Sequence, residues 1–142
     1  MKAKYIIIVI ISFLGLFGHS IRSNADVMLE KEDSIHKIIM DRVKQINTQC
    51  PIKADEATTY LQTLMSGKTL IIKAQIKDEY LDKIDYGKFK RKMCKNYSKL
   101  LDKQFVEFIK TEGYSVQYLF FDEHDIAITK IKISGEDILK YY

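Results

Sequence analysis

The spacing of hydrophobic residues changes along the chain and predicts helices alternating with pairs of strands. Between Asp33 and Asn47, apolar residues recur every three or four positions, which is typical of a helix with one buried face. Asp33 or Ser34 is a suitable N-cap for it. Pro51 pushes Cys50 toward an extended conformation, so the helix must end before this point. The apolar face consists of Ile35, Ile38, Ile39, Val43 and Ile46.

A strand-like pattern follows. The segment 56–65 is rich in threonine and apolar residues, and the segment 69–77 alternates apolar with polar side chains, as half-buried strands do. Ser66-Gly67-Lys68 lies between them as a hairpin turn, in which Gly67 is free to adopt a positive φ. An acidic connector, residues 78–84, follows this hairpin.

A second, longer helix is predicted to begin at Asp85 and to reach about Glu112, with Gly113 as its C-terminal stop. Asn96-Tyr97-Ser98 is the point where this helix is expected to bend or break. The apolar arc of the helix contains Phe89, Met93, Tyr97, Leu100, Leu101, Phe105 and Phe108.

The last part of the chain predicts a second hairpin, in which 114–121 and 126–133 pair around the turn 122–125. The apolar parity of the returning strand shifts, which indicates a β-bulge near Thr129 and Lys130. A final short turn is expected over 134–139. The pattern as a whole predicts an α+β fold of the order helix, hairpin, helix, hairpin (αββαββ). Its economical form is a four-stranded antiparallel sheet with both helices on one face.

The first 25 residues have the features of a secretory signal peptide. Lys2 and Lys4 precede an apolar run from Tyr5 to Gly18, and Ser23-Asn24-Ala25 offers small residues at the cleavage site. A membrane anchor is the alternative, but a spanning helix needs about 20 apolar residues and this run is shorter. We therefore expect a leader over 1–25, a single mature domain over 26–142 with no transmembrane segment, and an exported location, either periplasmic or extracellular.

Removal of the leader changes the charge of the protein. The net charge of the whole sequence is +4, but Lys2, Lys4 and Arg22 lie in the leader, so the mature chain has 20 basic and 19 acidic residues. A nucleic-acid partner would call for a clustered basic excess in the folded domain. The composition therefore gives no support for nucleic-acid binding.

The two cysteines, Cys50 and Cys94, both lie in the mature chain. An even number of cysteines in an exported protein favours a disulfide over a metal site or a catalytic thiol. We therefore predict a bridge between Cys50 and Cys94. It would join the segment before the first hairpin to the second helix.

A row of lysines is predicted on the polar side of the second helix. These side chains could contact an anionic surface, such as phospholipid headgroups or an acidic protein. The alternative, which the near-zero mature charge favours, is an ordinary solvated helix face. The row consists of Lys88, Lys92, Lys95, Lys99 and Lys103.

The string Asn47-x-x-Cys50-Pro51-x-x-x-Asp55-x-x-Thr58, followed by a hairpin and a helical cysteine, resembles a group of small, uncharacterised exported bacterial proteins. The resemblance covers most of the mature chain. It implies that these positions and Cys94 are the marked positions of the group. Asp55 and Thr58 could have a structural role, in which their side chains cap backbone groups of a turn. Alternatively, the two could form a polar pair in a functional site.

Candidate catalytic chemistry is sparse. The sequence has no G-x-S-x-G, H-E-x-x-H or glycine-rich phosphate loop, so no catalytic residue and no cofactor is predicted. The turn 122–125 contains acidic residues and His124, but four polar residues at a hairpin tip usually form only a turn. No metal site is predicted there.

Two functions from different classes remain. The preferred one is an exported, non-catalytic binding or structural module of the bacterial envelope, whose partner is an unknown protein or envelope component. The alternative is an inhibitor or immunity-type protein that acts on an exported enzyme through a protruding loop. The connector 78–82 and the turn 122–125 are the candidate loops. A small hydrolase would instead require a deep pocket with converging polar groups.

Overall fold

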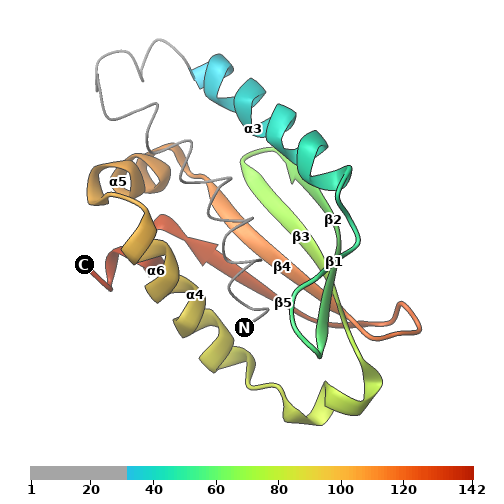
Figure 1. The fold of residues 1–142 in the computed structure, drawn as a ribbon. Helices are drawn as coiled ribbons and strands as arrows, with labels where there is room; N and C mark the ends of the chain where they lie inside the picture. The colour runs from blue at the N-terminus through green and yellow to red at the C-terminus, as the bar shows by residue number, and fades with distance from the viewer. Residues whose placement is uncertain (1–31) are drawn as a thin grey trace.

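The computed structural model describes residues 32–142, and the predicted leader lies outside this range. Within the range, no helix is both long and apolar enough to cross a membrane. The elements are drawn in Figure 1. Their order is α3 (Glu32–Asn47), β1 (Ile52–Lys53), β2 (Thr58–Ser66), β3 (Thr69–Ile76), the 3-10 helix η1 (Asp78–Lys83), α4 (Tyr86–Leu100), α5 (Lys103–Glu112), β4 (Ser115–Phe121), β5 (Ala127–Ser134) and α6 (Gly135–Leu139).

The strands form one mixed sheet in the order β1-β2-β3-β4-β5. The α+β class and both hairpins are confirmed, but the prediction of four antiparallel strands is wrong. The short strand β1 adds to the edge at β2, and β3 runs parallel to β4, with Thr69 opposite Ser115. The reason is the connection between the hairpins: η1, α4 and α5 carry the chain back to the end of the sheet where β3 began. A long crossover of this kind joins parallel neighbours.

The predicted second helix is two helices. Leu101 leaves the helical region with φ −98° and ψ 141°, and the Asp102 side chain accepts a hydrogen bond from the Phe105 backbone N–H at 2.8 Å. Asp102 is therefore the N-cap of a new helix, α5. The break follows residue 100, and the expected weak point at 96–98 lies inside α4. The predicted stop at Gly113 is confirmed by its φ of 77°.

The helices cover one face of the sheet (Figure 1), and more than the two predicted lie there. Alternate residues of the central strands point into this layer, with Ile72 of β3 and Tyr118 of β4 side by side in the register. Both are almost fully buried, as is Tyr97 of α4. The Tyr97 and Tyr118 hydroxyl groups lie 2.6 Å apart and share a hydrogen bond at the centre of the core.

The bulge in β5 lies close to its predicted position. Phe120 pairs with Thr129 and Phe121 with Ala127, which leaves Ile128 as the extra residue, one position before the expected site. Beyond the bulge, Ile131 and Ile133 are buried, whereas Ile128 is 37% exposed. The first part of β5 is therefore an uncovered edge of the sheet.

Candidate binding site

An apolar pocket opens between α3 and α5 above the parallel strands β3 and β4. The space inside it that is open to water-sized molecules is about 50 Å³. Nearly all the side chains around it are aliphatic or aromatic. We use the term "apolar pocket" for the space lined by Ile39, Met65, Lys68, Leu70, Tyr97, Leu101, Phe105, Phe108, Ile109, Tyr114, Ser115, Val116, Ile133, Gly135 and Ile138.

The fold positions these residues through two periodicities. Leu70 and Val116 are opposite each other in the parallel pair β3–β4, and strand alternation points both toward the helical layer. Phe105 and Ile109 are four positions apart on α5 and therefore share one helix face. Ile39 of α3 completes the opposite wall. The pocket thus consists mainly of apolar faces that the sequence pattern assigns to the core, at a place where the helices of residues 32–142 leave the sheet uncovered.

The polar groups of the pocket have partners. The Tyr97 hydroxyl group shares a hydrogen bond with Tyr118, and burial raises the pKa of Tyr97 above its ordinary value, which keeps the phenol neutral. The Ser115 hydroxyl oxygen lies 3.2 Å from that of Thr69. The Lys68 ammonium group donates to the Glu112 carbonyl oxygen at 2.8 Å. These contacts stabilise the rim and the floor of the pocket.

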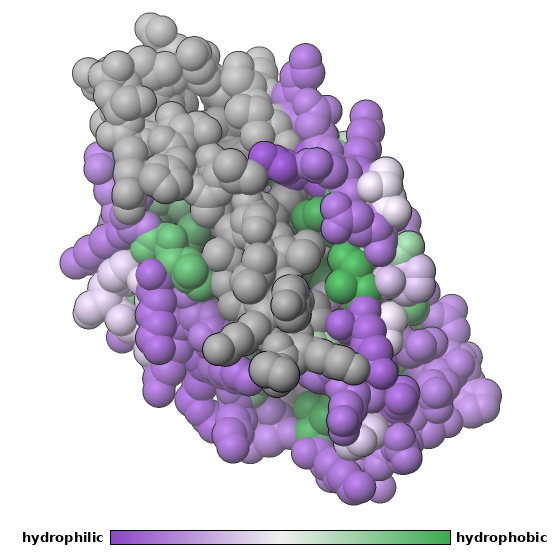
Figure 2. All heavy atoms as spheres, in the orientation of Figure 1, coloured by the Kyte–Doolittle hydropathy of each residue, from purple (hydrophilic) through white to green (hydrophobic). Residues whose placement is uncertain are grey.

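The lining of the pocket is almost entirely apolar. Among the described lining residues, none is an aspartate, glutamate, histidine or cysteine. The lining groups that acid–base or nucleophilic chemistry could use include the Tyr97 and Ser115 hydroxyl groups and the Lys68 amine, and these make the hydrogen bonds described above. Figure 2 shows several green, hydrophobic areas on this side of the molecule. The arrangement suits the burial of an apolar group.

The predicted disulfide is wrong. Cys50 and Cys94 are both free thiols. Cys50 lies just before β1 at one edge of the sheet, whereas α4, which contains Cys94, contacts β5 and α6 at the other edge. Burial raises the pKa of both thiols above their ordinary value. Both are therefore poor thiolate nucleophiles at neutral pH.

The other positions of the Asn47–Thr58 string lie around the start of the sheet and do not line the pocket. Asn47 uses its amide group to donate to the Thr63 carbonyl oxygen and to accept from the Thr63 backbone N–H, both at 2.8 Å. Asp55 accepts from the backbone N–H groups of Ala57 and Thr58 at 2.8 and 2.7 Å. Asn47 thus joins the end of α3 to β2, and Asp55 forms the turn into that strand. Pro51 is exposed and Thr58 half-buried.

The predicted lysine row is divided between two helices. Lys88, Lys92, Lys95 and Lys99 lie on α4, whereas Lys103 is the first residue of α5, beyond the helix break. All five are exposed, and none lines the apolar pocket.

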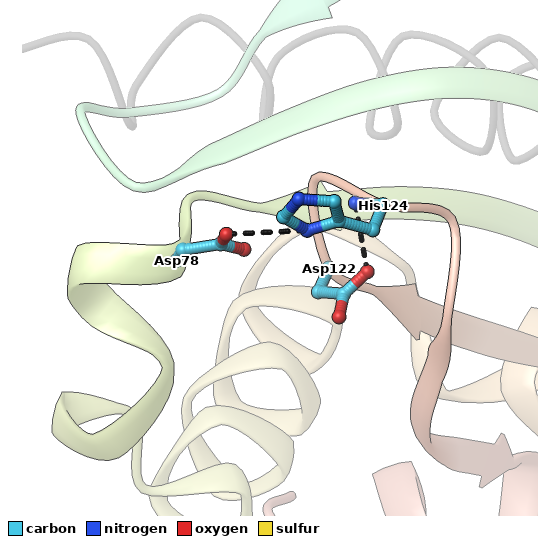
Figure 3. A group of neighbouring side chains, drawn as sticks. All are labelled: Asp78, Asp122 and His124. Atoms are coloured by element: carbon cyan, nitrogen blue, oxygen red, sulfur yellow. Dashed lines mark hydrogen bonds and ion pairs between the residues drawn. The ribbon is translucent and has the colours of Figure 1, made fainter.

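The two acidic loops that the sequence offered as separate candidates contact each other. Asp78, at the start of η1, accepts a hydrogen bond from the Glu123 backbone N–H at 3.2 Å. Its other carboxylate oxygen lies 3.4 Å from His124 Nδ1. Figure 3 shows Asp78, Asp122 and His124 together, one from η1 and two from the β4–β5 turn. The local sequence gave no signal for this contact, because it joins residues more than 40 positions apart.

Sequence reasoning also did not predict the pocket. The sequence pattern places Phe105 and Phe108 on an apolar helix arc and Leu70 on one face of a strand, but it does not include Ile109 in the arc. Phe105 and Leu70 are indeed buried. The local pattern also gives no role to Gly135, at which an added Cβ atom would lie 2.8 Å from the Lys110 backbone nitrogen of α5. A glycine inside the predicted turn 134–139 is the one sequence signal for close packing there.

Comparisons with known proteins give a fold but no family. No family model matches the chain, and no curated protein matches it in sequence. Among solved structures, it is similar to a protein of Pseudomonas aeruginosa that is predicted to be secreted, with 9% identity and a TM-score of 0.58. That match covers 82% of this chain and 99% of the other.

Two pilotins of type II secretion systems are also similar in structure. EpsS from Vibrio vulnificus has 11% identity and a TM-score of 0.59, over 77% of this chain and 96% of the pilotin. AspS from Vibrio cholerae has 12% identity and a TM-score of 0.56, over 78% of this chain and 97% of the pilotin. At these identities the likeness is one of fold, so this chain has the fold of two pilotins and of a protein predicted to be secreted.

Proposed function

We propose that the protein is an exported, non-catalytic module of the bacterial envelope, and that its apolar pocket binds an apolar segment of a protein partner. The observation that carries this proposal is the pocket itself, which is open between α3 and α5 and lined almost entirely by apolar side chains. An open pocket of this kind in a small domain is the usual place for a ligand.

The fold and the leader support the location. The structural neighbours are a protein predicted to be secreted and two secretion-system pilotins, and the first 25 residues have the features of a signal peptide. The two pilotins are components of secretion systems. By analogy, we propose that this chain has a protein partner in the envelope. Each aliphatic or aromatic side chain that a partner buries fully in the pocket would contribute about 1.5–3 kcal/mol.

The test uses a photo-crosslinking amino acid in place of Phe108, at the half-buried rim of the pocket, in the protein produced and exported by its own bacterium. We expect one cross-linked protein species. The substitution Ile109→Asp places a charge among apolar side chains and should reduce this product about tenfold or more, because the partner would have to bury the carboxylate.

The matched control is Leu64→Asp. Leu64 is also aliphatic and is 39% exposed, and it neighbours the pocket residue Met65 on β2, so it points to the opposite face of the sheet. The cross-linked product should persist in this variant. Equal products from Ile109→Asp and wild type, with both folded by circular dichroism, would exclude the pocket as the binding site.

The basic surface of α4 supports a second candidate, contact with an anionic membrane surface. This helix contains six basic residues and no acidic one, and Lys88, Lys92, Lys95 and Lys99 are exposed. The net charge of the predicted mature chain is close to zero, so the support for this candidate is the local excess of basic residues on α4 and not the overall charge.

Charge reversal tests this candidate. We expect the protein to bind vesicles that contain phosphatidylglycerol, and the double variant Lys92→Glu/Lys99→Glu to lose most of that binding in a sedimentation assay. Binding should weaken as salt rises from about 0.05 to 0.5 M, because counter-ions screen exposed charges. Reversal of Lys130 and Lys132 on β5 controls for net charge. Vesicle binding that is equal in both double variants would exclude α4 as the contact.

A further inference from the structure

The contact between η1 and the β4–β5 turn gathers a set of possible metal ligands outside the apolar pocket. One carboxylate oxygen each from Asp78 and Asp122 and one ring nitrogen of His124 lie within 4.8 Å of one another. The residues come from two segments that the parallel pairing of β3 and β4 brings to the same end of the sheet. In Figure 3 the imidazole ring lies between the two carboxylates.

The separation of His124 from Asp78 is close to that of two ligands of one metal ion, and the Asp122 oxygen lies within 4.8 Å of both. Zinc binds histidine nitrogen and carboxylate oxygen at about 2.0–2.2 Å, which in tetrahedral geometry places neighbouring ligand atoms roughly 3.3 Å apart. The distance from His124 Nδ1 to the Asp78 Oδ2 atom is 3.4 Å. The His124 side chain is 73% exposed, so it can rotate toward Asp122 without disturbing the core.

Backbone groups hold both carboxylates in orientation. The Oδ1 atom of Asp122 accepts from the backbone N–H groups of His124 and Ile126, each at 2.9 Å. The Oδ1 atom of Asp78 accepts from Glu123 N at 3.2 Å. In each carboxylate the second oxygen is left for a cation, and hydrogen bonds to the first oxygen orient ligands in this way in metal sites.

We propose that Asp78, Asp122 and His124 bind a divalent first-row transition metal, of which zinc is the best match. One imidazole with two carboxylates is a ligand set for zinc and its neighbours. Calcium and magnesium prefer sites made entirely of oxygen, with six or more ligands. Three protein ligands leave a fourth position for water. The bound metal joins η1 to the β4–β5 turn and stabilises the loop region that follows β3.

The test is isothermal titration of the tag-free exported protein, stripped with EDTA, with zinc chloride alone. We expect one zinc ion per chain and a Tm that rises with zinc concentration, because the metal binds the folded state. His124→Ala and Asp78→Asn should each weaken binding by at least about tenfold, since even the loss of a group that only orients a ligand costs this much. Calcium chloride should produce no comparable heat.

Two matched variants complete the experiment. Asp82→Asn changes another exposed carboxylate of η1, and His36→Ala removes the other histidine of the predicted mature chain; both should bind zinc as the wild type does. In EDTA, each variant should have a Tm close to that of the EDTA-treated wild type. Absence of zinc binding by the wild type, or binding that persists unchanged in both His124→Ala and Asp78→Asn, overturns the proposal.

Discussion

Replacing Gly135 with alanine is expected to destabilise the protein by at least about 1–3 kcal/mol, as overpacking does in a close-packed interior. A Cβ atom at this position would lie 2.8 Å from the Lys110 backbone nitrogen and 2.9 Å from the Lys110 Cβ atom. These atoms belong to α5 and cannot rotate away, so α5 and α6 would have to separate. Gly135 also lines the apolar pocket, so the substitution should change the shape of the pocket as well. Urea denaturation followed by circular dichroism measures the loss.

Gly87→Ala is the matched control for this substitution. Gly87 is exposed in the first turn of α4, and the nearest atom to an added Cβ would be the Asp85 carboxylate oxygen at 3.4 Å. Alanine favours a helix over glycine by up to about 1 kcal/mol, so this variant should be neutral or more stable. Equal destabilisation of the two variants would contradict the close approach of α5 and α6.

The second large effect is expected at the tyrosine pair in the core. Tyr97→Phe removes one hydroxyl group of the 2.6 Å contact and leaves the Tyr118 hydroxyl group buried without that partner. An unsatisfied buried polar group costs about 1–3 kcal/mol. Tyr118→Phe should cost a similar amount for the same reason. Thermal unfolding of both variants measures these values.

The double variant Tyr97→Phe/Tyr118→Phe separates a hydrogen-bond effect from a packing effect. When both hydroxyl groups are replaced by apolar atoms, no unsatisfied group remains, and the change can be nearly neutral. We therefore expect the double variant to be more stable than the sum of the single losses implies, by a coupling energy of about 0.5–3 kcal/mol. Strictly additive losses would show that the two hydroxyl groups do not interact.

Local elements could be predicted from the sequence because their signals are local. The alternation in β3 placed Ile72 and Ala74 on the buried face, and Gly67 and Gly113 marked a hairpin turn and a helix end; both glycines have a positive φ. Such signals depend on the period of side-chain burial and on backbone sterics, which a few neighbouring residues determine.

Long-range features could not be predicted in this way. The order of the strands depends on how the connection through α4 and α5 packs, and that connection also decides that β3 and β4 are parallel. The helix break depended on Asp102, whose capping ability is visible in the sequence but competes with a continuous apolar arc through Leu101 and Phe105. Leu101 would be buried both in one continuous helix and at a break between two helices. The apolar arc alone therefore could not distinguish these two structures.

The cysteine and loop assignments failed or stayed incomplete for a related reason. The number of cysteines and the expected compartment carry no information on the distance between Cys50 and Cys94, which lie toward opposite edges of the sheet. The sequence around His124 does not indicate that Asp78 lies beside it, because no local pattern joins the two residues. The candidate sites of this protein are assembled from segments that only the tertiary fold brings together.

The parallel pair also has a consequence for the order in which the chain acquires its structure. Thr69 and Ser115, which begin the two paired strands, are 46 positions apart. A chain that emerges from the ribosome or a translocation channel amino end first must therefore complete its first hairpin long before the matching strand arrives. Until then, α3 is the only helix among the described residues that has been made and can cover the inward side of that hairpin, and β3 lacks its parallel partner. Folding is expected to be slow at this step, and a holding chaperone would shield the nascent protein from aggregation.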